Sequence, residues 1–204
     1  MPTALRHRAR RRPDYAMIAS FIAPGSRVLD LGCGDGQLLV ELSQQKGCQV
    51  RGIEINARFV AEAIHNGIPV YNGDMLEGMG HYRDHSFDVV VLSQTLQQTL
   101  DPQAVLREML RIGERAIVSF PNFGLFKTRL QLLFSGRMPR HEFLPYTWYE
   151  TPNVHLCTVK DFYDLCSDMD LEVTREVFLS PSGKRLPHRL ANLFAGLAIF
   201  ELQS

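Results

Sequence analysis

Apolar and polar positions follow two periods along this chain, one typical of strands and one typical of helices. Short apolar runs predict seven strands, at residues 27–31, 49–55, 70–71, 87–92, 115–120, 172–179 and 195–202. Between several of these runs apolar residues recur at helical spacing, which predicts helices near 15–22, 37–45, 58–65, from 102 and from 159. Alternating strands and helices indicate a mainly parallel sheet with helices on both faces and an antiparallel C-terminal strand.

Local signals mark where the predicted helices begin and end. Pro24 and Gly25 end the first helix. Asp101 before Pro102 is a good helix start, and Thr158 with Asp161 forms a capping-box pattern. The run at 87–92 is nearly all valine, as expected of a strand buried on both faces. A loop is predicted from residue 180 to 184, between the last two strands.

The stretch from 121 to 157 breaks the alternation. It is rich in aromatic and basic residues, and four apolar ones share a helical face: Phe126, Leu130, Leu133 and Phe134. Aromatic residues and arginine are enriched at protein interfaces, which favours an interaction surface. A lid over a substrate pocket and ordinary core packing are the alternatives.

Composition and charge narrow the classes of protein. The chain has 204 residues, 45% of them hydrophobic, and a formal net charge of +0. Residues 1–12 hold five arginines, which leaves 17 Lys and Arg against 22 Asp and Glu in the rest. We predict a disordered basic tail at 1–13, with an acidic partner as its alternative use, and a single domain at 14–204 elaborated at about 121–157. The acidic body argues against nucleic-acid binding.

The spacing of the cysteines and the hydropathy of the chain indicate the cellular compartment of the protein. The four cysteines form no C-x-x-C pair and have no metal-ligand spacing, so we expect reduced thiols and no metal site. No apolar run approaches the roughly 18 residues of a membrane span. We therefore expect a cytoplasmic protein that does not bind membranes.

The most informative residues follow the first predicted strand. Residues 28–36 read V-L-D-L-G-C-G-D-G, in which Asp30 is followed by Gly32, Gly34 and Gly36. A strand that ends in a glycine-rich turn and opens a helix brings bare backbone close to a ligand. Cys33 is a small filler within the turn. A tight turn without a ligand is the alternative.

This motif resembles motif I of class I S-adenosylmethionine (SAM) dependent methyltransferases, so a Rossmann-like fold and SAM or S-adenosylhomocysteine are implied. Glu54 ends the second strand, where a carboxylate can accept both ribose hydroxyls, and Ile55 beside it can pack on adenine. By the same resemblance Asp74 holds the adenine amine and Met75 packs on the ring. Ser93, after the fourth strand, completes the predicted cofactor site. An exposed strand-end acid and a Gly-Asp turn are the structural alternatives for Glu54 and Asp74.

The segment after the fourth strand lacks an expected acid–base residue. Proteins resembling the ubiquinone-biosynthesis methyltransferases read S-x-x-L-x-H-x-x-D-P here, whereas this chain has Gln98 in place of the histidine. Glutamine cannot exchange a proton near neutral pH. Other candidate bases are His155, Tyr149, His141 and Glu142. None is directed at a substrate by the sequence, so no catalytic residue is assigned.

Several longer segments resemble the MetW family of bacterial methionine-biosynthesis proteins, among them A-I-V-S-F-P-N-F-G, L-P-Y-x-W-Y-x-T-P-N-V-H-L-C-T and K-D-F. The resemblance runs from about Met17 to the C-terminus. It implies a SAM-binding accessory or regulatory partner that a MetX-type homoserine O-acyltransferase needs for activity. The alternative is an active methyltransferase for a small carbonyl or carboxylate metabolite. The identity of an acceptor, the oligomeric state and the acetyl or succinyl chemistry of the partner stay open.

Overall fold

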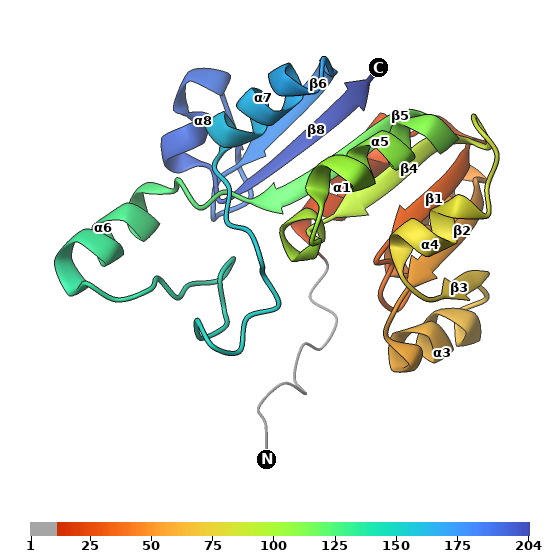
Figure 1. Cartoon of the computed structure of the whole chain (residues 1–204), viewed down its shortest axis with the longest axis horizontal. Coiled ribbons are helices and arrows are strands. Elements are labelled where there is room, and N and C mark those ends of the chain that lie inside the picture. The colour runs from red at the N-terminus through yellow and green to blue at the C-terminus, as the bar shows by residue number, and fades with distance from the viewer. Residues whose placement is uncertain (1–11) are drawn as a thin grey trace.

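One eight-stranded sheet runs through the computed structural model, which describes residues 12–204 (Figure 1). Its strand order is β3-β2-β1-β4-β5-β8-β6-β7. Strands β1 to β5 pair in parallel, whereas β8 lies antiparallel between β5 and β6, and β7 is antiparallel to β6. The strands are β1 (Arg27–Leu31), β2 (Gln49–Glu54), β3 (Val70–Asn72), β4 (Phe87–Ser93), β5 (Gly113–Pro121), β6 (Glu172–Leu179), β7 (Arg185–Leu186) and β8 (Leu197–Gln203).

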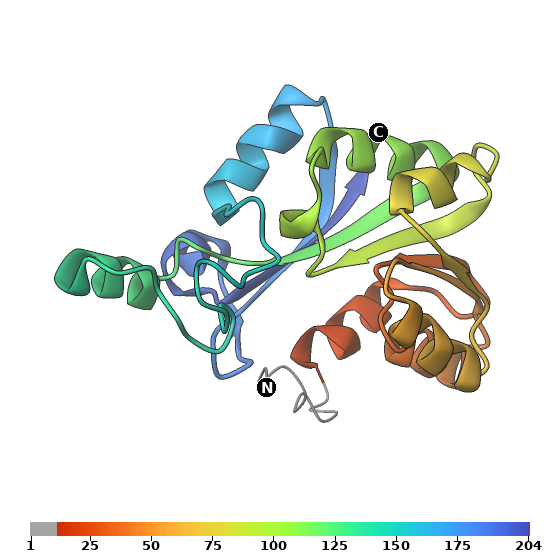
Figure 2. The same ribbon diagram turned by 60° about the horizontal axis from the view of Figure 1, so that its bottom comes forward.

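Helices cover both faces of this sheet, as Figure 2 shows. The core on one face takes in residues of α5 and α7, and the core on the other face takes in residues of α1, α2 and α3. The helices are α1 (Pro13–Phe21), α2 (Gln37–Lys46), α3 (Ala57–His65), α4 (Met75–Gly80), α5 (Pro102–Ile112), α6 (Phe126–Ser135), α7 (Val159–Asp168) and α8 (His188–Phe194), with a 3-10 turn η1 (Leu96–Gln98).

The predicted fold class is confirmed, including the antiparallel C-terminal strand. The predicted strand start at 195 moves to Leu197, because α8 ends at Phe194 just before it. The described part of the chain has eight strands instead of seven, since β7 pairs two residues with the end of β6. Helices α4 and α8 were also not predicted. Both are six or seven residues long, too short to establish a helical period.

The two predicted helix starts are present. The Asp101 carboxylate accepts a hydrogen bond from the amide of Ala104 at 2.9 Å, and Thr158 with Asp161 forms a complete capping box. The valine-rich run lies in β4, between β1 and β5, with Val89 to Leu92 fully buried. The two helix-start signals are reliable because each satisfies backbone groups that a helix end leaves unpaired.

We call residues 122–158, between β5 and α7, the arm. Asn122 at its root is buried, and its side-chain nitrogen donates toward the carbonyls of Ala191, Asn192 and Ala195 at 2.9–3.3 Å. Its oxygen accepts from the amides of Gly124 and Val159. The asparagine of the S-F-P-N-F-G segment therefore fastens α8, α7 and the start of the arm together.

Three sequence expectations concern the chain as a whole. Residues 1–11 of the predicted basic tail lie outside the described residues. All four cysteines are free thiols. Across residues 12–204 no helix combines the length and the apolar character that crossing a membrane requires.

Candidate functional site

The predicted site residues gather at the carboxyl edge of the parallel strands. The strand order reverses between β1 and β4, and ligands of open α/β sheets bind outside the carboxyl ends at such a reversal. Asp30 lies in β1, the glycine turn follows that strand, Glu54 ends β2, and Ser93 ends β4. Asp74 follows β3 at the outer end of this edge. Four adjacent strands thus supply the candidate site.

The turn after β1 depends on glycine. Gly32, Gly34 and Gly36 have φ values of 67°, 57° and 77°, in the left-handed region that side chains with a Cβ rarely adopt. A Cβ on Gly32 would also come within 2.9 Å of the Thr95 hydroxyl, whereas a Cβ on Gly34 would meet open space. The backbone at Gly34 is therefore open to close approach by a ligand.

Glu54 joins the turn to β2. Its Oε2 accepts a hydrogen bond from the Gly34 amide at 2.9 Å, and its Oε1 accepts one from the Asn56 amide at 2.8 Å. The side chain is buried, so the alternative of an exposed strand-end acid is wrong. Each carboxylate oxygen has two lone pairs, and one bond to each leaves capacity for two hydroxyl donors.

Asp30 is a buried carboxylate with an unpaired oxygen. It is 3% exposed, and its Oδ1 is buried without a hydrogen-bond partner. Burial, with the negative charges of Glu54 and Asp14, raises the pKa of Asp30 to about 7, although Arg12 opposes the shift. An orphaned carboxylate oxygen beside an open glycine backbone fits a ligand that carries a cationic N–H donor.

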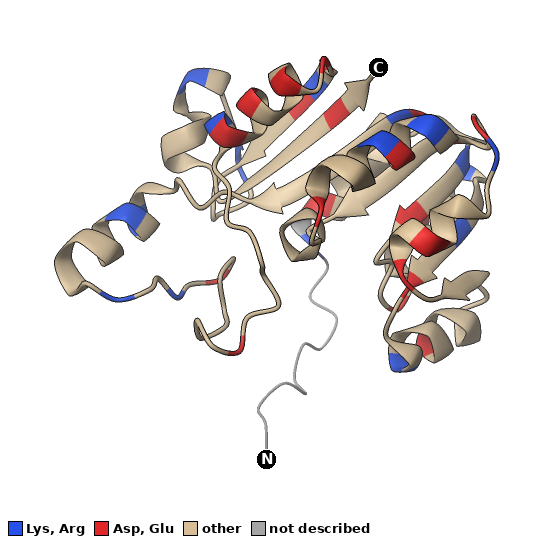
Figure 3. Ribbon diagram, in the orientation of Figure 1, with Lys and Arg blue, Asp and Glu red and all other residues tan. Residues whose placement is uncertain are grey.

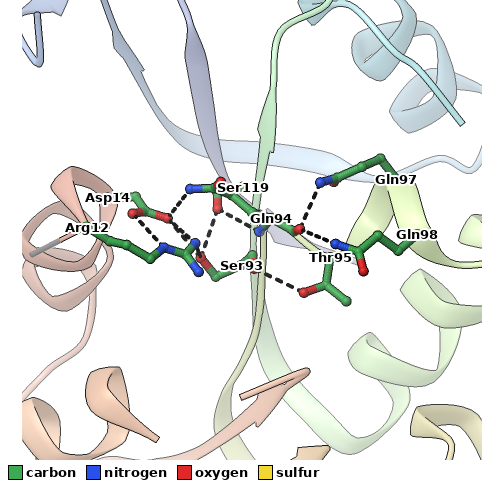
Figure 4. A network of polar contacts seen from close by, with 8 residues as sticks. All are labelled: Arg12, Asp14, Ser93, Gln94, Thr95, Gln97, Gln98 and Ser119. Carbon is green, nitrogen blue, oxygen red and sulfur yellow. Dashed lines mark hydrogen bonds and ion pairs between the residues drawn. The ribbon is translucent and has the colours of Figure 1, made fainter. Parts of the chain in front are cut away.

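A polar network from α1 and its preceding residue closes one side of the edge (Figure 4). The Arg12 guanidinium contacts the Asp14 carboxylate at 2.6 Å and the Ser93 hydroxyl at 2.7 Å. Asp14 accepts further bonds from Ser93 at 3.0 Å and from the Gln94 amide at 2.9 Å. Burial opposes ionisation of Asp14, but Arg12 and these donors outweigh it and hold the pKa of Asp14 below its ordinary value.

This network gives Ser93 and Arg12 roles that differ from those predicted from the sequence. Ser93 donates to Asp14 and lies within hydrogen-bond distance of Arg12 and of Ser119, so its hydroxyl has no capacity left for a ligand. Arg12, assigned from the sequence to the basic tail, is instead anchored at the site. The sequence reasoning missed Arg12, Asp14 and Gln94, although the Pro-Asp pair at the start of α1 was a visible helix-start signal.

The remaining candidates lie around this centre. Ile55 is 70% exposed directly after Glu54, and Met75 is half-buried against the core at the start of α4. Asp74 is exposed and caps α4 by accepting from the Leu76 amide at 2.8 Å. Cys33 is buried against Gly52, where a Cβ would lie 2.4 Å from its sulfur, so it fills the turn as predicted. Burial raises the pKa of the Cys33 thiol, which keeps it neutral.

The segment after β4 connects the site to the arm. The side-chain amides of Gln97 and Gln98 both donate to the Gln94 carbonyl, at 2.8 and 3.3 Å. The Gln97 carbonyl accepts from the amides of Val154 and His155 in the arm, at 2.8 and 3.0 Å. The chain between Gln94 and Gln97 therefore contacts the site at one end and the arm at the other.

The candidate bases are engaged elsewhere or exposed. His141 interacts through both ring nitrogens, with the Thr128 hydroxyl at 2.9 Å and the Phe143 amide at 3.4 Å, and burial lowers its pKa. His155 contacts the Leu100 carbonyl at 3.4 Å, and Tyr149 is exposed on the arm. None of the three is hydrogen-bonded to Asp30, Glu54 or Gln98, so within residues 12–204 these candidates assemble no general base at the site.

Away from this edge, the described residues offer a hollow but no metal-binding cluster. A hollow of about 490 Å³ lies at the amino ends of the strands, lined by residues that include Arg27, Val50 and Phe87. It is at the opposite edge from the glycine turn and contains none of the predicted site residues. Within residues 12–204 no cluster of His, Cys, Asp and Glu is arranged to hold a metal ion.

Comparison with known proteins identifies the family. The sequence model described as methionine biosynthesis protein MetW matches residues 12–202. The chain belongs to the MetW family. This membership places it in methionine biosynthesis. A curated relative, the bifunctional methionine biosynthesis protein MetXA/MetW of Rhodopirellula baltica, is 34% identical over 198 residues, which cover 91% of this chain and 32% of the relative. The MetW-family chain thus spans about a third of the length of that relative.

Solved structures show the fold but not the reaction. A SAM-dependent methyltransferase from Mesorhizobium loti aligns with a TM-score of 0.68 at 16% identity, over 95% of this chain and 99% of that one. The [4+2]-cyclase SpnF aligns with a TM-score of 0.64 at 17% identity, over 93% and 80%. A fold shared by proteins with these two descriptions does not specify methyl transfer.

The buried carboxylate of Asp30 predicts how the stability of the protein depends on pH. Its folded-state pKa of about 7 exceeds its ordinary 3.8, so between these pH values the folded protein holds a proton that the unfolded chain releases. Raising the pH through this window therefore lowers the free energy of unfolding, by up to roughly 4 kcal/mol. We expect Asp30→Asn to raise Tm at pH 8 by several degrees, and by less at pH 5.

Thermal unfolding of wild type and variant at both pH values measures this effect. The exposed Asp164, on α7, provides the matched control, and Asp164→Asn should unfold like the wild type. A lower Tm for Asp30→Asn at pH 8 would show that the ionised carboxylate is stabilised in the folded protein and would contradict this account.

Proposed function

We propose that the chain binds SAM at the carboxyl edge of β1, β2 and β4. The orphaned oxygen of buried Asp30 carries this proposal, because the α-ammonium of SAM is a cationic donor of the kind it lacks. The Arg12 guanidinium, part of the same edge, suits the carboxylate of the same amino-acid tail. Glu54 has the free acceptor capacity for the ribose hydroxyls.

The strand order indicates where the adenine end of the ligand would lie. β2 and β3 are neighbours, so Ile55, Asp74 and Met75 lie beyond Glu54 along the edge. Exposed Ile55 and half-buried Met75 offer apolar contact to a ring, and Asp74 offers an acceptor to its amine. When bound, SAM would supply a sulfonium methyl group. The chain's own residues would bind and orient it.

We further propose that the bound cofactor serves regulation, and that the chain is the accessory partner of a MetX-type homoserine O-acyltransferase. Gln98, and the lack of a base assembled from the candidates within residues 12–204, support a binding role over acid–base catalysis. The relative described as MetXA/MetW carries both names in one chain, which supports association of the two proteins. Because SAM is made from methionine, its binding would make the activity of the acyltransferase depend on the level of methionine, the end product.

An active methyltransferase is the alternative, favoured by the gathering of Asp30, Glu54 and Asp74 at one edge of the sheet. Methyl transfer from a sulfonium needs little beyond positioning, so a missing base does not exclude it. Release of S-adenosylhomocysteine in the presence of small carbonyl and carboxylate metabolites would establish this activity. It would also contradict a purely regulatory role.

The SAM site is tested by calorimetry. We expect Asp30→Asn to weaken SAM binding by about 100-fold, because it removes the charge that faces the ammonium group. Wild-type affinity should also fall as the pH drops below about 7, where Asp30 takes up a proton. Asp164→Asn should bind like the wild type at every pH. Unchanged affinity in Asp30→Asn would remove the basis of the cofactor assignment.

The accessory role is tested with the acyltransferase encoded by the same organism. We expect the purified enzyme to form a complex with this chain and its turnover to rise at least about tenfold, an effect of the size of a typical coupling free energy. Size-exclusion chromatography detects the complex, and release of coenzyme A measures turnover. Equal turnover with and without this chain, together with separate elution, would overturn the proposal.

A further inference from the structure

Helix α6 extends away from the sheet with large apolar side chains uncovered. Only Thr128 among its ten residues is buried. Leu133 is 73% exposed and Phe134 is 81% exposed, and Leu130 and Leu132 are exposed as well. Figures 1 and 2 both show the helix projecting from the body of the molecule. A ten-residue helix is marginal alone in water, so this exposure calls for a partner surface.

Half-buried Phe126 and three of the exposed residues form a continuous face. Phe126, Leu130, Leu133 and Phe134 follow the i, i+4, i+7, i+8 spacing of one side of a helix. The ring of Phe126 lies 5.5 Å from that of Phe194 at the end of α8. Phe194 is itself exposed, as are Leu190 and Leu193. The apolar face therefore continues from α6 onto α8, and we call these seven residues the α6–α8 face.

The arm holds this face in place before any partner arrives. His141 bonds Thr128 at 2.9 Å, and the amide of Arg140 donates to the Gln131 side chain at 3.3 Å, so the loop is tied back to α6. Leu144 is buried, and Asn122 fastens the root to α7 and α8. A surface that is already ordered loses little conformational entropy on binding.

Basic side chains flank the face. Lys127 and Arg129 lie on α6, and Arg137 and Arg140 follow it, all exposed. Figure 3 shows these blue segments on the arm, with fewer red ones. An apolar centre with a charged rim is the arrangement of a specific protein interface. Its complement is an apolar groove about 15 Å long, the length of ten helical residues, edged by carboxylates.

We propose that the α6–α8 face docks into such a groove on the homoserine O-acyltransferase. This inference rests on the accessory function proposed above. The acyltransferase is chosen over a second copy of this chain because the bifunctional relative carries the MetXA and MetW names in one chain. It is also favoured because the rim of the face is basic, so two copies would bring like charges together.

A double variant, Leu133→Asp with Phe134→Asp, tests the face. Both side chains are exposed, so the substitutions leave the core intact, and unchanged SAM binding confirms this. Ile64→Asp is the matched control, since Ile64 is an exposed apolar residue on α3 at the opposite end of the sheet (Figure 1). Biolayer interferometry measures the affinity of each variant for the purified acyltransferase, and coenzyme A release measures activation.

We expect the double variant to bind the acyltransferase at least about 100-fold more weakly and to lose activation, and Ile64→Asp to match the wild type. Wild-type affinity in the double variant would overturn the inference while leaving the accessory function standing. No binding by the wild type would overturn the accessory function itself. Dimers of the wild type that the double variant abolishes would assign the face to a second copy and overturn the choice of partner.

Discussion

The sharp turn after β1 is the constraint on which the site depends. Three glycines take left-handed backbone angles, and the Gly34 amide is held by Glu54 at the end of β2. The amides of Gly32 and Cys33 both donate to the Ile53 carbonyl, so the ends of β1 and β2 are joined by backbone as well. This geometry buries Asp30 behind the turn and leaves the backbone at Gly34 open.

Asp30 is buried with one oxygen unpaired, which lowers the stability of the folded protein. The same unpaired oxygen favours binding of a cationic ligand. Arg12 lies near enough to moderate the charge, but its own strong contacts are with Asp14 and Ser93. A cationic ligand would complete the pairing that the chain leaves open, so its binding would relieve a cost already present in the folded protein. The chain from Gln94 to Gln97 then connects this edge to the arm through the amides of Val154 and His155. The proposed cofactor site and the arm are thus joined by one short, hydrogen-bonded segment.

The sequence was sufficient for features that repeat or that satisfy local backbone groups. Strand β1, the glycine turn, the Asp101 cap and the capping box at Thr158 were all predicted. Short elements such as β7 and α8 were not, because they follow no period long enough to detect. Arg12 was missed for another reason. Its partner Ser93 lies 81 residues away, and only the fold brings the two together.

Linkage between the two proposed ligands tests the account most directly. The dissociation constant of the acyltransferase complex should be measured without SAM and at saturating SAM, and that of SAM with and without the acyltransferase. If the two sites are coupled, both constants change by the same factor, of about 5-fold to 150-fold. Equal acyltransferase affinity with and without SAM, in a protein that binds both, would contradict the claim that the cofactor site controls the partner.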